Sequence, residues 1–123
     1  FILDGAHNPS GAKTLYNGLK LHFSQEKKSF VFGAFKDKDV ENVLNNMGEL
    51  LTTMYIASAP GERGMDIASL KNICEKHCNN VITNASISEA IENAYKDDSK
   101  IVVIFGSLSI LQEAKECIRG LNG

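Results

Sequence analysis

The chain begins FILDGAHNPSG (residues 1–11), where an apolar run changes abruptly into a short polar segment. The apolar run favours a strand, and the residues after it favour a turn followed by a helix. Pro9 suits the first position of a helix because its missing N–H is not needed there, and Asn8 is then the natural N-cap. The opening stretch therefore predicts a strand, a tight turn and a helix in succession.

Asp4 and His7 lie in this predicted turn together with Asn8. Ligands of open α/β sheets bind at the carboxyl ends of strands, and a helix N-terminus attracts anions through its unpaired N–H groups. A carboxylate, an imidazole and an amide would thus meet at a point that favours phosphate or carboxylate. The residues alone fit two alternatives equally: this anion site, or a capped turn with Asp4 and His7 in solvent.

The composition is that of an ordinary globular domain. The 123 residues are 43% hydrophobic and 23% charged with a net charge of −2, which suffices for one core. No basic excess suggests a nucleic-acid partner, and no apolar run suggests a membrane span or signal peptide, so we expect neither nucleic acid nor membrane as a partner. Three cysteines fit a reducing cytoplasm better than a disulfide framework.

Strand and helix patterns alternate along the rest of the chain. Apolar runs predict further strands at 29–34, 54–57, 81–83 and 101–105. Helical spacing predicts five helices: about 9–24, after Asp39, from about Asp66, after a capping box of Ser86 and Glu89, and after Ser107. We expect an α/β doubly wound fold, with a mostly parallel sheet of five or six strands flanked by about five helices.

Two of these segments carry further expectations. Residues 101–105 are apolar without alternation, which predicts a central strand covered on both faces. In the fourth helix the spacing turns Ala90, Ile91, Ala94 and Tyr95 toward the core.

Four loops fall on the carboxyl edge of such a sheet: residues 4–8, 36–39, 60–63 and 106–107. This clustering follows from the topology alone, so it is weak evidence that every loop acts. Arg63 fits either a fork onto a phosphate or carboxylate or an ordinary surface arginine. Gly106 would let the backbone approach a ligand closely, and Ser107 would cap the next helix or hold a polar group.

Other motifs are excluded by their spacing. The glycine and lysine at positions 11 and 13 are not adjacent, and the chain has no Gly-x-Gly-x-x-Gly, so neither a Walker A loop nor a dinucleotide site is expected. Cys74, His77 and Cys78 fall within about one helical turn, but no fourth soft ligand accompanies them. We therefore expect no metal site and interpret the cysteines as small buried helix residues.

Four stretches carry a family resemblance that spans residues 2 to about 108. Asp-Gly-Ala-His-Asn-Pro at 4–9 resembles the signature of folylpolyglutamate and dihydrofolate synthases, at the start of their Mur ligase C-terminal domain. Residues 31–39, the Ala-Pro at 59–60 with Arg63, and the strand and Gly-Ser-Leu turn at 103–108 are similar to later segments of the same family. The chain departs from the family pattern at 109–113 and at Gly64, where the family usually has Ala.

The resemblance implies an ATP-dependent amide ligase that adds L-glutamate to a folate through an acyl phosphate, and that in bifunctional members forms dihydrofolate from dihydropteroate. It implies roles for six residues of this chain. Asp4 and Asn8 would bind ATP, His7 would be catalytic and contact glutamate, Ser107 would bind glutamate, and Lys38 and Arg63 are second-line candidates.

The resemblance also implies what accompanies this chain. Residues 1–123 would be a single Mur ligase C-terminal-like domain of a longer protein, since the chain starts within a predicted strand and without Met. The P-loop and the magnesium ligands would belong to a larger N-terminal domain, which would be a partner along with folate, ATP and L-glutamate. The isolated domain should then be inactive. The alternatives are another Mur-family amino-acid ligase and a stand-alone nucleotide- or anion-binding module.

Overall fold

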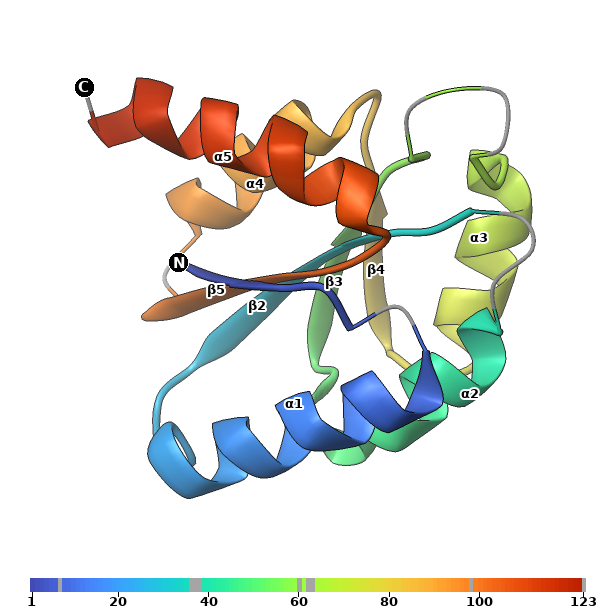
Figure 1. Cartoon of the computed structure of the whole chain (residues 1–123), viewed down its shortest axis with the longest axis vertical. Coiled ribbons are helices and arrows are strands. Elements are labelled where there is room, and N and C mark those ends of the chain that lie inside the picture. The colour runs from blue at the N-terminus through green and yellow to red at the C-terminus, as the bar shows by residue number, and fades with distance from the viewer. Residues whose placement is uncertain (7, 36–38, 60, 62–63, 98, 123) are drawn as a thin grey trace.

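Strands and helices alternate along the chain in the computed structural model, which describes residues 1–6, 8–35, 39–59, 61, 64–97 and 99–122 (Figure 1). Five strands and five α-helices lie in this described part, in agreement with the expected five or six strands and about five helices. The elements are β1 (Ile2–Asp4), α1 (Pro9–His22), β2 (Lys28–Gly33), α2 (Val40–Met47), the 3₁₀ turn η1 (Gly48–Leu50), β3 (Thr53–Ile56), α3 (Ile67–Glu75), β4 (Asn80–Thr83), α4 (Ile87–Lys96), β5 (Ile101–Gly106) and α5 (Leu108–Asn122).

The strands form one sheet in the order β1-β5-β2-β3-β4. Every strand pairing in the described residues is parallel, which the alternation of strands and helices predicted. The last strand, β5, is inserted between β1 and β2 and is hydrogen-bonded on both sides. This confirms the prediction that residues 101–105 form an interior strand.

The two faces of the sheet have separate cores. Alternate residues of β2 and β5, such as Phe30 and Phe105, pack under α1, α2 and α3. The residues between them, such as Val31 and Ile104, pack under α4 and α5. Figure 1 shows α4 and α5 above the sheet, with α1 and α2 below it. A sheet covered on both faces needs strands that are apolar at successive positions, as β2 and β5 are.

Helix caps fix the starts of the helices. The Asn8 side-chain oxygen accepts the Gly11 N–H at 2.8 Å, and Asp39, Asp66 and Ser86 cap α2, α3 and α4 in the same way. The caps Asn8 and Ser86 were predicted from the sequence, which also predicted helix starts after Asp39 and at about Asp66. The reciprocal bond of the predicted capping box differs, because Glu89 accepts the N–H of Ala85 at 2.7 Å and not that of Ser86.

Tyr95 corrects one prediction, since it is 52% exposed and does not face the core. Its ring stacks on Phe1 with centroids 5.7 Å apart, so it finds an aromatic partner at the surface. Tyrosine tolerates such a position because its hydroxyl stays in water. Predicted element ends were off by one or two residues; α1, for example, stops at His22 and not near 24.

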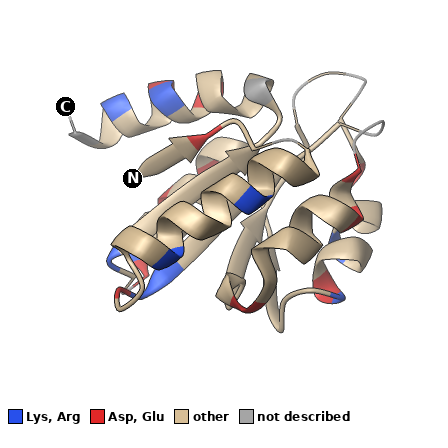
Figure 2. Cartoon of the chain, turned by 60° about the horizontal axis from the view of Figure 1, so that its bottom comes forward, with Lys and Arg blue, Asp and Glu red and all other residues tan. Residues whose placement is uncertain are grey.

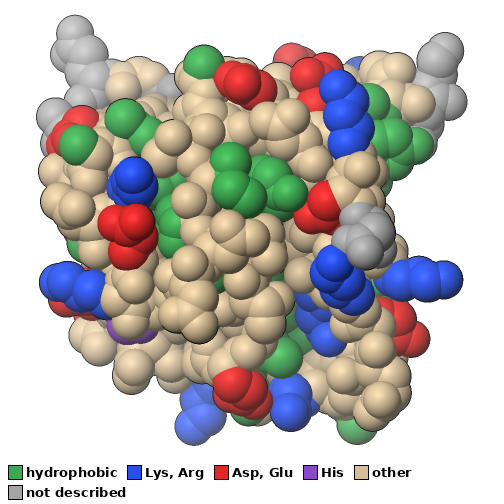
Figure 3. Space-filling model, turned by 180° about the vertical axis from the view of Figure 1, so that it is seen from behind, with side chains coloured by type: hydrophobic (Ala, Val, Ile, Leu, Met, Phe, Trp, Pro, Cys, Tyr) green, Lys and Arg blue, Asp and Glu red, His purple; other side chains and the backbone are tan. Residues whose placement is uncertain are grey.

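Charges are spread over the surface. Figure 2 shows Lys and Arg, Asp and Glu distributed over several helices and their ends, and Figure 3 shows both signs interspersed on the back of the molecule. Along the described part of the chain, no helix is long and apolar enough to cross a membrane.

The position of β5 creates a topological switch point in the sheet. The helices that follow β1 and β2 cover one face of the sheet, whereas the helix that follows β5 covers the other. The chain therefore leaves neighbouring strands in opposite directions at their carboxyl ends. Such a switch point is where open α/β sheets bind ligands.

Candidate functional site

The turn between β1 and α1 is closely packed. Asp4 ends β1 and pairs in register with Phe105 of β5. Ala6 is buried beneath the first turn of α1, where a Cβ on Gly11 would approach its Cα to 3.3 Å. Asp4 is half-buried and Asn8 is exposed, so both side chains are accessible at the carboxyl edge.

Asn8 keeps donor capacity after capping α1. Its side-chain oxygen accepts the Gly11 N–H, and its backbone carbonyl accepts the Ala12 N–H at 3.0 Å. The NH₂ group of the amide is the part of Asn8 that remains for a ligand. His7 lies outside the described residues, as do Lys38 and Arg63.

The turn after β5 depends on two glycines. Gly106 has a φ of +124°, and a Cβ there would lie 2.1 Å from the carbonyl oxygen of Gly33, its register partner at the end of β2. That carbonyl accepts the Ser107 N–H at 3.2 Å. Glycine at position 106 therefore lets β5 and β2 stay in contact at the end of the regular sheet, whereas a Cβ on Gly33 would lie 2.8 Å from the Ala57 carbonyl oxygen, on the side of β3.

Ser107 is 2% exposed, and its hydroxyl oxygen accepts the backbone N–H of Phe35 at 3.1 Å. The side chain therefore holds a polar group, which is one of the two uses expected for it. Because a hydroxyl both accepts and donates, its hydrogen remains available to an acceptor.

The next loop joins the same edge. The Met65 N–H donates to the Ala34 carbonyl at 3.0 Å, and Phe35 pairs with Gly64 in an isolated antiparallel bridge. A Cβ on Gly64 would lie 2.1 Å from the Ala59 carbonyl oxygen, which gives a physical reason for glycine at this point of the chain. The segments after β5, β2 and β3 are thus connected.

The topology places two predicted site residues at neighbouring strand ends. Asp4 ends β1, and Ser107 comes two residues after Phe105, the residue of β5 that is in register with Asp4. Asn8 opens the helix that starts from β1. The sequence pattern missed Gly33, although a glycine that closes an apolar strand is a signal of close backbone approach.

The comparisons with known proteins agree with this geometry. A family model described as Mur ligase, glutamate ligase domain, matches residues 1–115. The chain belongs to this family. A dihydrofolate synthase/folylpolyglutamate synthase of Bacillus subtilis is 28% identical in an alignment of 123 positions, which covers 95% of this chain and 27% of that protein.

Two solved structures show the same fold in related enzymes. The folylpolyglutamate synthase of Thermotoga maritima has a TM-score of 0.82 at 34% identity, over 92% of this chain and 26% of its own. A bifunctional folylpolyglutamate synthase/dihydrofolate synthase of Yersinia pestis, complexed with AMPPNP and a Mn ion, has a TM-score of 0.80 at 26% identity, over 95% and 28%. This glutamate ligase domain thus spans about a quarter of the length of the relatives that it matches.

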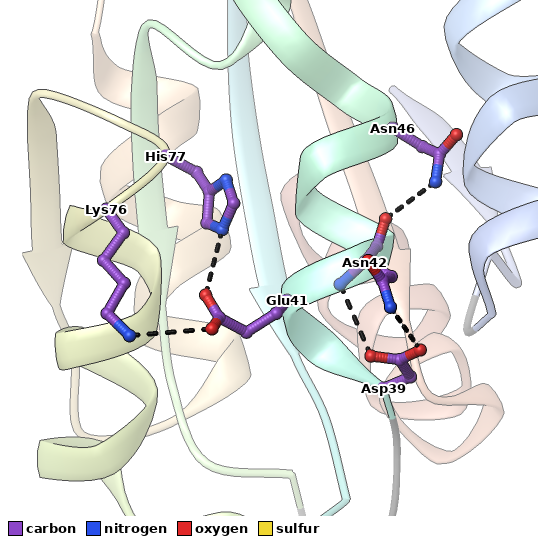
Figure 4. Close-up of polar contacts among 6 residues, drawn as sticks. All are labelled: Asp39, Glu41, Asn42, Asn46, Lys76 and His77. Carbon is purple, nitrogen blue, oxygen red and sulfur yellow. Dashed lines mark hydrogen bonds and ion pairs between the residues drawn. The ribbon is translucent and has the colours of Figure 1, made fainter.

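Two of the three cysteines of this glutamate ligase domain, Cys74 and Cys78, are buried. Burial raises the pKa of the Cys74 thiol to about 12, and burial also raises that of Cys78. His77 is turned toward α2, where its Nε2 lies 3.2 Å from Glu41, and Lys76 lies 3.6 Å from the same carboxylate (Figure 4). The hydrogen bond from His77, with the Lys76 charge, lowers the pKa of Glu41. Within the described ranges, no three His, Cys, Asp or Glu side chains are grouped as metal ligands.

Two open hollows lie far from the switch point. They have volumes of about 220 and 160 Å³ and are lined by residues such as Lys28 and Thr52, or Phe1 and Lys100, at the amino ends of strands. Both hollows are therefore at the opposite end of the sheet from the carboxyl edge that carries the predicted site residues.

Proposed function

We propose that this chain is the C-terminal, glutamate-binding domain of an ATP-dependent ligase that adds L-glutamate to tetrahydrofolate. The observation that carries the proposal is that Asp4 ends β1 and Ser107 directly follows the neighbouring strand β5, so that two of the family motifs lie at the switch point. The names of the relatives support the folate substrate, and the AMPPNP in the Yersinia structure supports ATP.

The proposed reaction has two steps. The terminal carboxylate of the folate takes the γ-phosphoryl group of ATP, which gives an acyl phosphate and ADP. The amino group of L-glutamate then attacks the acyl carbon, an amide bond forms, and inorganic phosphate leaves with the bonding pair. Both steps need charge neutralisation and exact alignment of the reactants more than they need covalent help from the protein.

Each candidate residue has a role suited to its chemistry. Asp4 accepts hydrogen bonds from ATP, with the ribose hydroxyls as the expected donors, and the Asn8 NH₂ group donates to phosphate oxygens. His7 acts at the acyl phosphate and the incoming glutamate. Ser107 donates its remaining hydrogen to a glutamate carboxylate. Lys38 and Arg63 are second-line cations for the same anions.

The divalent metal belongs to another part of the proposed enzyme. The Mn ion of the Yersinia structure supports a requirement for Mg²⁺. The described residues of this chain lack a cluster of carboxylates that would hold it. We therefore assign the metal and most contacts to ATP to an N-terminal domain, without which this domain is expected to be inactive.

A second activity, the formation of dihydrofolate from dihydropteroate and L-glutamate, is favoured by the names of the Bacillus and Yersinia relatives. It uses the same edge of the sheet with a shorter acceptor. A cytoplasmic location is part of the proposal, since the cysteines at 74, 78 and 117 are all free.

An incorporation assay tests the proposal. The protein that carries this chain is supplied with ATP, Mg²⁺ and labelled L-glutamate, and with tetrahydrofolate, dihydropteroate or a peptidoglycan precursor as acceptor. We expect label in tetrahydrofolate, and label in dihydropteroate if the protein is bifunctional. Transfer to the peptidoglycan precursor alone would identify another Mur-type ligase, and no transfer to any acceptor would favour a binding module.

A further inference from the structure

The hydrogen bonds at the carboxyl edge form a short ladder that continues past the regular sheet. The ladder runs from the turn after β5 to the loop after β2, through the bonds that Ser107 makes with Gly33 and Phe35. It then runs to the loop after β3, where the Met65 N–H bonds to Ala34. Three loops that come from different parts of the sequence are therefore held as one edge.

Ser107 supplies the side-chain link in this ladder. The bonds between Ser107 N and Gly33 O and between Met65 N and Ala34 O join backbone groups. The bond from Phe35 N–H ends on the Ser107 hydroxyl, 72 residues away in sequence. A substitution at Ser107 can therefore remove one link while every backbone group of the ladder stays in place.

Burial makes this link hard to replace. Ser107 is 2% exposed and its bond to the Phe35 N–H is partly buried, so the bond is shielded from most of the solvent. A hydrogen bond between two neutral groups makes a modest net contribution to stability, and this contribution is lost with the hydroxyl. Phe35 would then be held less firmly beside the turn after β5.

We propose that Ser107 is a positioning residue, whose hydroxyl oxygen holds residues 34 and 35 after β2, and through them Met65 after β3, at the carboxyl edge of the sheet. Its effect on glutamate rests on the proposed function. Because the Ser107 hydroxyl oxygen accepts the Phe35 N–H, its own hydrogen points toward a different acceptor. In the proposed reaction, that acceptor is a carboxylate of L-glutamate. One side chain thus couples glutamate binding to the arrangement of two neighbouring loops.

Ser109 provides a matched control two residues later in the chain. Its Oγ is buried and has no hydrogen-bond partner in the described residues. Ser109→Ala removes the same kind of hydroxyl group from the first turn of α5 without breaking any bond of the ladder.

Amide hydrogen exchange tests the coupling in the protein that carries this chain. We expect Ser107→Ala to speed exchange at both Phe35 and Met65 by about three- to ten-fold, which corresponds to the loss of one neutral hydrogen bond. Ser107→Thr keeps the hydroxyl and should restore the slow exchange, and Ser109→Ala should leave it unchanged. Unchanged exchange in Ser107→Ala, or faster exchange at Phe35 without Met65, would overturn the coupling.

The incorporation assay supplies the functional readout. Ser107→Ala should raise the KM for glutamate about ten-fold or more, by losing a hydrogen bond to a charged group, and Ser107→Thr should recover most of this loss. An unchanged KM in Ser107→Ala would contradict a role at the glutamate site. If the wild-type protein incorporates no glutamate while exchange responds as expected, the proposed function fails and the loop coupling stands.

Discussion

Gly106→Ala should destabilise the chain more than any other change of one methyl group that we consider. Gly106 has a φ of +124°, and an alanine Cβ would lie 2.1 Å from the Gly33 carbonyl oxygen. The backbone conformation costs a non-glycine residue about 1–3 kcal/mol. The shift that relieves the overlap breaks the bonds of Ser107 to Gly33 and Phe35, at about 1 kcal/mol each.

Gly106→Ala is therefore expected to lower the free energy of unfolding by about 3–5 kcal/mol, a large part of the roughly 5–15 kcal/mol that stabilises a typical domain. Urea unfolding of the 123-residue chain measures it, with an unchanged m-value as the sign that the two states are the same. Gly18→Ala is the matched control, since Gly18 lies within α1 and has open space around its Cβ. The free energy of unfolding of the Gly18→Ala control should rise by about 0.5–1 kcal/mol, because alanine favours a helix interior over glycine. A Gly106→Ala chain within 1 kcal/mol of wild type would refute the contact between β5 and β2.

Three further predictions concern stability. Burial raises the pKa of Asp97, but the hydrogen bonds from Ser29, Ser99 and Tyr55 outweigh it and lower the pKa overall. The stabilisation that the Asp97 carboxylate provides is therefore present above the ordinary pKa of about 3.9 and is lost as pH falls through the lower pKa of the folded chain. Asp97→Asn should make the melting temperature less dependent on pH between pH 6 and pH 3, and an unchanged pH dependence would contradict this. Ser109→Ala should raise the free energy of unfolding by about 1 kcal/mol, because it removes a buried hydroxyl that has no hydrogen-bond partner in the described residues. A lower melting temperature would mean that this hydroxyl makes a stabilising hydrogen bond. Asn8→Ala should cost about 1 kcal/mol in urea unfolding through the lost cap of α1, whereas no loss would mean that the cap is dispensable.

Local signals in the sequence predicted most of the fold. The caps Asn8, Asp39, Asp66 and Ser86 stand directly before helical patterns, and each bond reaches only three residues along the chain. The apolar run at 101–105 predicted an interior strand because both of its faces had to be covered. Motifs at the strand ends then indicated the edge of the sheet at which we propose the site.

Contacts between distant residues could not be read in the same way. The register of Gly33 with Gly106 and the bond from Phe35 to Ser107 join segments about 70 residues apart, and neither has a local pattern. Ser107 was expected at the glutamate site, but its bond to the loop after β2 emerged only with the order of the strands. The helical spacing of Tyr95 predicted that it faces the core, whereas its stacking on Phe1 depends on where β1 lies in the sheet.

A comparison of two histidine variants tests the central claim, that the opening turn of this chain works in ATP-dependent glutamate ligation. His7→Ala and His22→Ala are assayed in the protein that carries the chain, with ATP, Mg²⁺, labelled L-glutamate and tetrahydrofolate. His22 is exposed in the last turn of α1, away from the carboxyl edge, and serves as the control. We predict that incorporation collapses in His7→Ala and persists in His22→Ala. Equal incorporation by both variants and the wild type would contradict a catalytic role for the opening turn.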